Sequence, residues 1–233
     1  MIITIDGPSI SGKTSVALML AQKLQFNYIA SGLLFRGLSY VLVNQFGYHD
    51  SQLHQPQQSD IEEALAHSHF KYIYSDQKGA QIFWEGNDIT FLLSDQKFGK
   101  YASIIGTNQS VRNALARLQH EIADNKNLVT DGRDAGSVIF PHADIKFFLT
   151  ASAEVRAHRW QKNQQKMGRD ISYDQAVKEI TERDERDSNR IIAPLLVPQG
   201  AIIIDNSNLT QEQTLQQLLK EIQKKGGIQI PPC

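Results

Sequence analysis

An eight-residue segment near the N-terminus has the residue types and spacing of a phosphate-binding loop. An apolar run, residues 2–5, precedes it, and a helical apolar pattern follows from Thr14, so a chance glycine turn is the weaker reading. The glycines let backbone N–H groups surround a phosphate, the lysine reaches the β- and γ-phosphates, and the threonine hydroxyl binds Mg²⁺. The segment fits G-x-x-x-x-G-K-[ST] and predicts ATP binding by Gly7, Pro8, Ser9, Ile10, Ser11, Gly12, Lys13 and Thr14.

Arginines and aspartates follow in a pattern that predicts a helix running from the core into a polar cleft. The helix is predicted to begin near Ser172, which forms a capping box with Gln175. Its apolar face, Ala176, Val177 and Ile180, becomes charged at the C-terminal end. The alternative is a solvated face with i,i+4 pairs such as Glu179–Arg183 and Glu182–Arg186. The charged positions on the inner face are Arg183, Asp187 and Arg190.

Two further groups of charged residues follow predicted strands. Asp131, Arg133 and Asp134 come directly after the run 128–130, and ligands of parallel sheets bind beyond the carboxyl ends of the strands. Arg156 and Arg159 share one helix face after the run 145–149 and belong to a segment that could close over a triphosphate. The alternative for the group at residues 131–134 is a polar turn at a strand end, and the alternative for Arg156 and Arg159 is an exposed basic helix.

The chain offers many cations but no arrangement for general base catalysis. The seven histidines are scattered, and no Ser-His-Asp triad or histidine metal cluster emerges. A hydroxyl acceptor often needs a base, whereas a phosphate acceptor is already anionic and needs its repulsion from ATP relieved. This composition therefore favours a kinase that transfers phosphate from one nucleotide to another.

Overall composition agrees with a small-molecule enzyme. The 233 residues carry a formal net charge of −1, so no broad basic field would attract nucleic acid or anionic lipid. No apolar stretch approaches the length of a membrane helix, and the N-terminus has no features of a signal peptide, so a cytoplasmic chain is expected. The one cysteine, Cys233, is the last residue and cannot form an intrachain disulfide.

Alternating strands and helices predict an α/β fold with a parallel sheet covered on both faces. Two runs, 70–74 and 80–84, predict a hairpin, with a third strand near Ile89, and so indicate an inserted antiparallel subdomain. A loop is predicted over 45–58, and Ser110 is a candidate N-cap for a helix through Ile122. Further strands are expected over 26–29, 128–130, 145–149 and 201–204, and helices from about Ser31 and over 211–224.

The order and spacing of these motifs resemble bacterial cytidylate kinases over roughly residues 2–222. The matching segments, in chain order, are Ile3–Ser9 with Gly12 and Lys13, Ser31-Gly32 with Arg36, Val111-Arg112, Asp131–Gly136, Phe140–Ala143, Glu182–Asp184, Arg186-Asp187, Asn189-Arg190 and Ala193–Leu195.

The resemblance implies a P-loop NTPase-type core, an inserted monophosphate-binding subdomain and a small helical lid. It places the core at residues 1–36, 105–155 and 171–233, the monophosphate-binding region at 37–104 and the lid at 156–170. It implies transfer of the ATP γ-phosphate to CMP or dCMP. The phosphate-loop motif predicts Mg²⁺ on Thr14, with Asp131 contributing through water, and the chain is expected to act as a monomer.

Residues carried over by the resemblance fall into two overlapping sets. Those expected to bind CMP are Ser31, Arg36, Ser103, Arg112, Arg133, Asp134, Arg183, Asp187 and Arg190. Those expected to act on the transferred phosphate are Lys13, Arg133, Arg156, Arg159, Arg183 and Arg190.

Several positions depart from the family pattern, and other functions remain open. Ala30 stands where an acidic or polar residue is usual, Ile10-Ser11 where small residues are usual, and Thr14 where glycine is common. Trp160 replaces a lid arginine. The alternatives are a P-loop kinase for another acceptor such as UMP, or a weakly active nucleotide-binding paralogue. A GTPase switch is disfavoured because no Asn-Lys-x-Asp element is present.

Overall fold

The computed structural model describes residues 1–226, which separate into two compact units; Cys233 lies outside the described residues. The first unit comprises residues 1–26 and the chain from residue 129 onward, and the second comprises residues 27–128. The predicted three-part division into core, monophosphate-binding region and lid stays a prediction.

The first unit contains a parallel sheet whose strands lie in the order β6, β1, β7, β8. Parallel pairs join β1 to β7 and β7 to β8. The interior of β1 is buried on both faces, which is typical of a parallel strand covered on both sides. The strands are β1 (Ile2–Asp6), β6 (Leu128–Gly132), β7 (Ile145–Thr150) and β8 (Ile202–Asp205).

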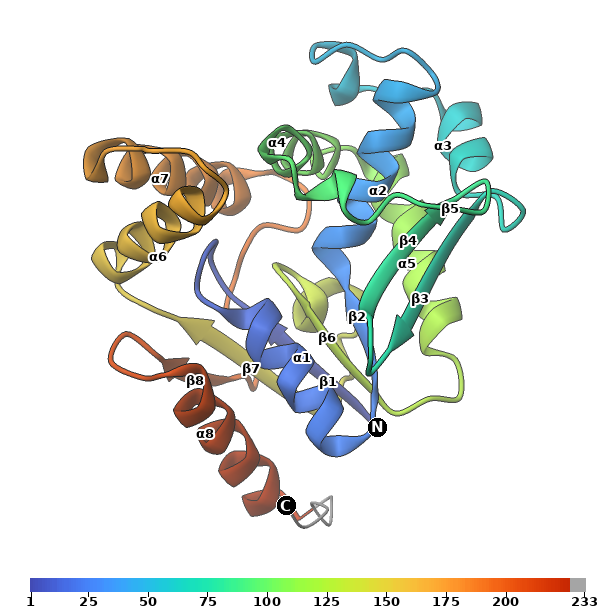
Figure 1. The fold of residues 1–233 in the computed structure, drawn as a ribbon. Coiled ribbons are helices and arrows are strands. Elements are labelled where there is room, and N and C mark those ends of the chain that lie inside the picture. Colours follow the sequence, from blue (N-terminus) through green and yellow to red (C-terminus); the bar gives the residue numbers. More distant parts are fainter. Residues whose placement is uncertain (227–233) are drawn as a thin grey trace. The chain divides into compact units, whose positions relative to one another are not determined.

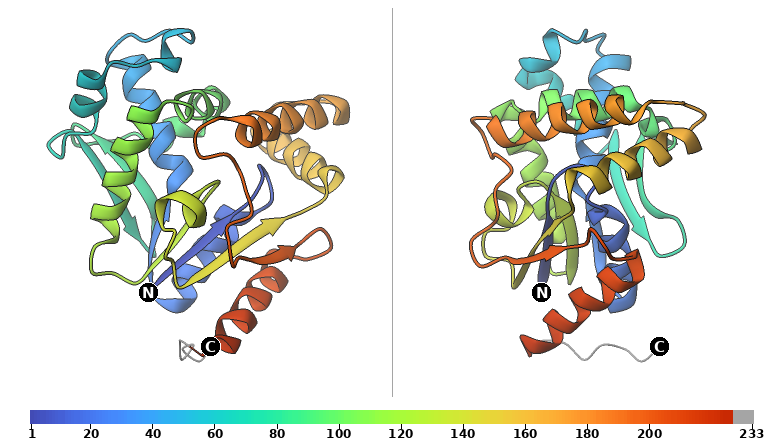
Figure 2. Two further views of the ribbon diagram at one scale, coloured as in Figure 1. Left: turned by 180° about the vertical axis from the view of Figure 1, so that it is seen from behind. Right: turned by 90° about the vertical axis from the view of Figure 1, so that its left-hand side faces the viewer.

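Helices of the first unit pack in two pairs. The helix α1 (Lys13–Leu24) lies against α8 (Gln211–Lys224), and α6 (Ala153–Lys166) lies against α7 (Tyr173–Asn189), as Figures 1 and 2 show. A short helical turn, Ala135–Ile139, packs on β1. The buried residues of α1 are spaced three and four apart, as the sequence predicted.

The second unit combines a hairpin with helices. Its three-stranded sheet has the order β3 (Phe70–Ser75), β4 (Gly79–Trp84), β5 (Asn87–Asp88), with antiparallel pairing. The remaining elements are β2 (Asn27–Ala30), α2 (Ser31–Asn44), the 3-10 turns Gln52–His54 and Leu92–Ser94, α3 (Gln58–Ala64), α4 (Gln96–Ile105) and α5 (Gln109–Ala123).

The structure confirms the hairpin and corrects some local assignments. The third strand covers Asn87–Asp88 rather than Ile89, because the Asp88 side chain accepts the Thr90 N–H and turns the chain there. The N-cap of α5 is Asn108, whose side chain accepts the Val111 N–H, and not Ser110. The helices α3 and α4 were not predicted.

The capping box lies on α8 rather than on α7. Ser172 accepts the N–H of Gln175, but the Gln175 side chain donates to Glu179 instead of returning to the cap. Thr210 and Gln213 make both reciprocal bonds at the start of α8.

Two glycines of α2 provide a test of packing in the second unit. A Cβ on Gly37 would lie 2.9 Å from Cζ of Phe70 and 3.2 Å from Cγ2 of Ile82, whereas a Cβ on Gly32 would meet nothing within 4 Å. Gly37→Ala should therefore lower the free energy of unfolding by about 1–3 kcal/mol through overpacking. Gly32→Ala, the matched control, should be neutral or stabilising by up to about 1 kcal/mol. Urea denaturation of both variants measures this, and equal stabilities would contradict the close packing at Gly37.

Candidate active site

The phosphate loop follows β1 directly and leads into α1. A Cβ on Gly7, where φ is 155°, would lie 2.1 Å from the carbonyl oxygen of Leu149, so only glycine fits there. Gly12 also has a positive φ, 88°, and precedes the first residue of α1, Lys13. The loop therefore brings backbone N–H groups to the helix N-terminus, as anion binding requires.

Lys13 is nearly fully buried beside this loop. Its Nζ donates to the carbonyl oxygen of Pro8 at 2.7 Å. Burial, with the nearby positive charge of Arg133, lowers the pKa of Lys13 well below its usual value. A bound polyphosphate would raise that pKa again and would favour the charged ammonium.

Thr14 and Asp131 supply a pair of oxygens suited to Mg²⁺. The Thr14 hydroxyl donates to Oδ2 of Asp131 at 2.6 Å, although the two residues are 117 positions apart. Hydroxyl and carboxylate oxygens are the ligands that Mg²⁺ prefers, with water filling further positions. Within residues 1–226, no group of three or more His, Cys, Asp or Glu side chains could hold a metal. The residues present therefore fit a magnesium ion shared with a nucleotide rather than a metal held by protein alone.

Two ion pairs orient the arginines expected at the acceptor side. Nε of Arg133 donates to Oδ2 of Asp187 at 2.8 Å, and Nη2 of Arg190 donates to Oδ1 of Asp134 at 3.3 Å. All four side chains are mostly buried. Burial alone would raise the pKa of Asp187, but Arg133, Arg183 and Arg190 hold it below its usual value. The structure thus brings these predicted residues together in the first unit.

Asp6, the last residue of β1, anchors the turn that carries Arg133 and Asp134. Its carboxylate accepts the N–H groups of Ala135 at 2.8 Å and Gly136 at 2.7 Å. A Cβ on Gly136 would lie 2.5 Å from Oγ1 of Thr4, so glycine permits this approach. Burial raises the pKa of Asp6 to about 6, and the nearby carboxylate of Asp134 adds to the shift.

The two arginines of α6 bind the phosphate loop rather than solvent. Arg156 donates to the carbonyl oxygens of Ser9 and Ala151, both at 3.1 Å. Arg159 donates to Oδ1 of Asn206 at 3.1 Å, to its carbonyl oxygen at 2.9 Å and to that of Ser11 at 3.4 Å. Their predicted roles on ATP, and the mobility of the segment 156–170, stay predictions.

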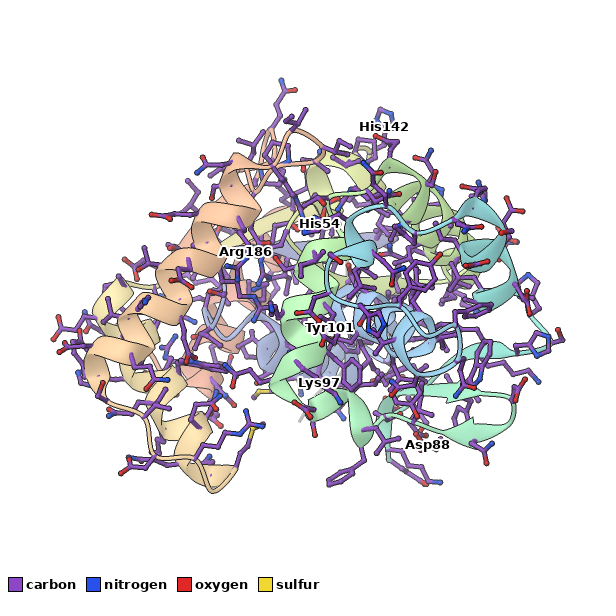
Figure 3. All side chains as sticks on the ribbon, turned by 90° about the horizontal axis from the view of Figure 1, so that it is seen from above. His54, Asp88, Lys97, Tyr101, His142 and Arg186 are labelled. Carbon is purple, nitrogen blue, oxygen red and sulfur yellow. The ribbon has the colours of Figure 1, made fainter. Side chains whose placement is uncertain are left out.

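The second unit holds the remaining predicted CMP ligands. Arg36, on α2, donates to the carbonyl oxygen of Leu93 at 2.8 Å. Arg112, on α5, is buried, donates to the carbonyl oxygen of Gly106 at 3.1 Å and lies over the ring of Phe35, 5.6 Å from its centroid. The other two are Ser31, the first residue of α2, and Ser103, on α4, the helix that also carries Lys97 and Tyr101 in Figure 3.

Two departures from the family pattern have local structural substitutes. The N–H of Ala30, which has no capping side chain, donates to the Tyr72 hydroxyl at 2.9 Å. Trp160 donates from Nε1 to Glu179 at 2.7 Å and packs on an apolar cluster of α6 and α7.

The sequence analysis assigned no role to three residues whose side chains bind the phosphate loop or the turn after β6. These are Asp6, Asp184 and Asn206, whose Nδ2 donates to the carbonyl oxygen of Ser11 at 2.9 Å. Asp6 and Asn206 each stand at the carboxyl end of a strand of the parallel sheet, a position that could have drawn attention to them.

The strand, phosphate loop and helix at the N-terminus define a P-loop nucleotide-binding protein. Similar folds occur in an uncharacterized protein from Eubacterium ventriosum, with a TM-score of 0.54, 13% identity and coverage of 96% of this chain and 98% of that one. The protein TT1252 from Thermus thermophilus gives a TM-score of 0.50 at 14% identity, covering 98% of each chain.

Sequence comparison identifies the family. The cytidylate kinase family model matches residues 3–224. The cytidylate kinase of Chlamydia felis is 40% identical over 220 residues, covering 94% of this chain and 96% of the relative. That of a Marinomonas species is 39% identical over 228 residues, covering 97% and 96%. The chain belongs to the cytidylate kinase family.

The buried Asp6 predicts a distinctive pH dependence of stability. Between pH about 6 and 3.8, the ordinary pKa of an aspartate, folded Asp6 keeps a proton that the unfolded chain releases, so its contribution to stability rises as pH falls. The shift corresponds to about 2–3 kcal/mol. In Asp6→Asn this contribution is absent.

Urea denaturation of both proteins between pH 7 and pH 4 tests this. The free energy of unfolding of the wild type minus that of Asp6→Asn should increase by about 2–3 kcal/mol as pH falls. Taking this difference removes the opposite slope from acids such as Asp187, whose pKa is lowered. A difference independent of pH would contradict the assigned burial of the Asp6 charge.

Proposed function

We propose that the chain transfers the γ-phosphate of ATP to CMP or dCMP, giving ADP with CDP or dCDP. Membership of the cytidylate kinase family supports the reaction, and the relatives carry that name. The observation that carries the proposal is that Arg133, which donates to Asp187 at 2.8 Å, lies together with Arg183 near both Asp187 and the phosphate-loop residue Lys13, and that these two positive charges lower the pKa of Lys13 and of Asp187. One charged cluster in the first unit thus joins the donor loop to residues expected at the acceptor.

On the donor side, the loop N–H groups and the N-terminus of α1 would bind the β-phosphate. Lys13 would move from the Pro8 carbonyl to the β- and γ-phosphates, where it stabilises charge that develops during transfer. Thr14 and Asp131 would hold Mg²⁺, directly and through water. Bound Mg²⁺ would neutralise charge on the β- and γ-phosphates.

On the acceptor side, Arg133 and Arg190 would bind the phosphate of CMP, and Arg183 would stabilise the transferred group. Asp187 would hold Arg133 in place and accept a hydrogen bond from the ribose. The roles of Ser31, Arg36, Ser103 and Arg112 as further CMP ligands are carried over from the family.

No general base is required in this reaction. The attacking oxygen belongs to a phosphate that is already ionised at neutral pH, so the chain's task is to orient two anions and neutralise their repulsion. Arginines suit it because their planar guanidinium groups bind phosphate oxygens in pairs and stay charged when buried.

The proposal places the chain among enzymes of free nucleotides, acting as a monomer in the cytoplasm without a nucleic-acid or membrane partner. The net charge of −1 supports the absence of a nucleic-acid partner. Among the helices of residues 1–226, none combines the length and apolar character needed to cross a bilayer.

Acceptor choice tests the proposal. In a coupled assay of ADP release, CMP and dCMP should exceed UMP by at least about tenfold in kcat/KM, and AMP should be poor, because a site that hydrogen-bonds one base leaves buried groups unpaired against another. Equal rates with UMP would assign the chain to another acceptor. Absence of transfer to any of the four would indicate a binding paralogue.

We further propose that the Asp134 carboxylate accepts a hydrogen bond from the cytosine amine, and Asp134→Ala tests this contact. We expect the CMP-to-UMP ratio of kcat/KM to narrow, mainly through loss of activity with CMP, because a carboxylate that accepts from the cytosine amine discriminates against uracil. Because Asp134 is also a partner of Arg190, its removal should lower the rates with both CMP and UMP. The ratio of the two kcat/KM values is therefore the informative quantity. Asp174→Asn, at an exposed position of α7, is the control and should leave the ratio unchanged. An unchanged ratio in Asp134→Ala would exclude this contact.

A further inference from the structure

Helix α7 contacts the phosphate loop through Asp184. Oδ1 of this side chain accepts the Ser9 N–H at 3.0 Å and the Ser9 hydroxyl at 2.7 Å. Oδ2 accepts from Nη1 of Arg156 in an ion pair. Three donors on one partly buried carboxylate fix its orientation, since bonds to an ionised acceptor are stronger than those between neutral groups.

Arg156 completes the contact from α6. The same Nη1 donates to the carbonyl oxygen of Ser9, and Nε donates to that of Ala151 after β7. Ser9 is therefore bound at its N–H, its carbonyl and its hydroxyl by side chains of the α6–α7 pair. This fixes the backbone of the loop at its third residue.

Ile10, the next residue, makes an apolar contact with the same helices. It packs on the buried cluster of Ala157, Ala176 and Ile180, which Trp160 also covers. Its φ is 57°, a left-handed conformation that costs energy in a β-branched residue and persists only where the surroundings impose it. Two consecutive loop residues are thus held by α6 and α7, one through polar bonds and one through apolar packing.

The same helix carries residues of the acceptor side. Asp187 lies three positions after Asp184, on the same side of α7, and pairs with Arg133. Arg186 is also on α7, but its side chain is exposed (Figure 3). A shift of α7 that changes the Arg133–Asp187 pair must therefore also change the Asp184–Ser9 contact, because a helix turn moves as a rigid element.

We propose that Asp184 is a positioning residue that couples the two nucleotide sites by linking the phosphate loop to α7. The inference rests on the proposed function, since it requires CMP and ATP as the two ligands. Binding of CMP orders α7, and α7 holds the loop in the form that binds the triphosphate. By linkage, ATP must strengthen CMP binding by the same factor.

Calorimetry measures this coupling directly. The affinity of the magnesium complex of AMPPNP, a non-hydrolysable ATP analogue, is determined without and with saturating CMP. In the wild type, CMP should increase the affinity by at least about fivefold, the lower end of the usual range of coupling. In Asp184→Ala this factor should fall below about twofold, while both ligands still bind.

Glu185→Gln is the matched control because it removes one negative charge from the next, exposed position of α7. It should keep the wild-type factor. Ser9→Ala removes the hydroxyl bond to Asp184 and keeps the N–H bond, so its factor should lie between those of the wild type and Asp184→Ala. This variant tests the proposal if Asp184→Ala fails to fold.

The outcomes separate this inference from the proposed function. If CMP barely changes the affinity of the wild type for the magnesium complex of AMPPNP, the coupling role is overturned while CMP phosphorylation stands. The same holds if CMP increases this affinity in Asp184→Ala by as much as in the wild type. If Asp184→Ala fails to fold, a full wild-type factor in Ser9→Ala overturns it. If Asp184→Ala binds both ligands more weakly but keeps the wild-type ratio of AMPPNP affinities with and without CMP, the role of Asp184 is purely structural. If the wild type neither binds nor phosphorylates CMP, the proposed function and this inference both fail.

Discussion

Buried arginines must be neutralised even when no nucleotide is bound, and this constraint organises the first unit. A cation removed from water is costly unless an acid compensates it. Three arginines of the first unit have such partners in Asp187, Asp134 and Asp184. The pairs compensate and orient the guanidinium groups, so that a phosphate meets donors already in position.

Two segments provide these acids. Asp184 and Asp187 occupy one side of α7, and Asp134 follows β6 on a turn that Asp6 anchors. The apolar half of α7, with Ala176 and Ile180, packs on α6. This packing fixes the position of the charged C-terminal half of the same helix. Packing of the helix pair therefore determines the geometry of the charges, which links the stability of the fold to catalysis.

The sequence predicted the elements whose patterns are local. Continuous apolar runs identified β1 and β7, and the spacing of buried residues identified α1 and α8. The seven-residue α3 is too short to show a helical period, and α4 contains Gly99, which disfavours a helix; both helices were missed. The motif predicted a strand, a loop and a helix in that order, and Lys13 and Thr14 lie in the first turn of α1, directly after the loop. The contact between Asp184 and Ser9 joins residues 175 positions apart, and only the packing of α7 determines it.

The central claim is that the arginines of the first unit are paired with acids before any nucleotide binds. The hydrogen bond of Arg133 in the free protein tests this claim most directly. In the ¹H–¹⁵N NMR spectrum of arginine Nε groups, Arg133 should give a signal protected from solvent exchange in the free protein, because its Nε–H is bonded to Asp187. The exposed Arg186 should exchange rapidly and serves as an internal reference. The account predicts that this protection is present in the wild type and lost in Asp187→Asn. An Arg133 signal that exchanges as fast as that of Arg186 in the free wild type would contradict it.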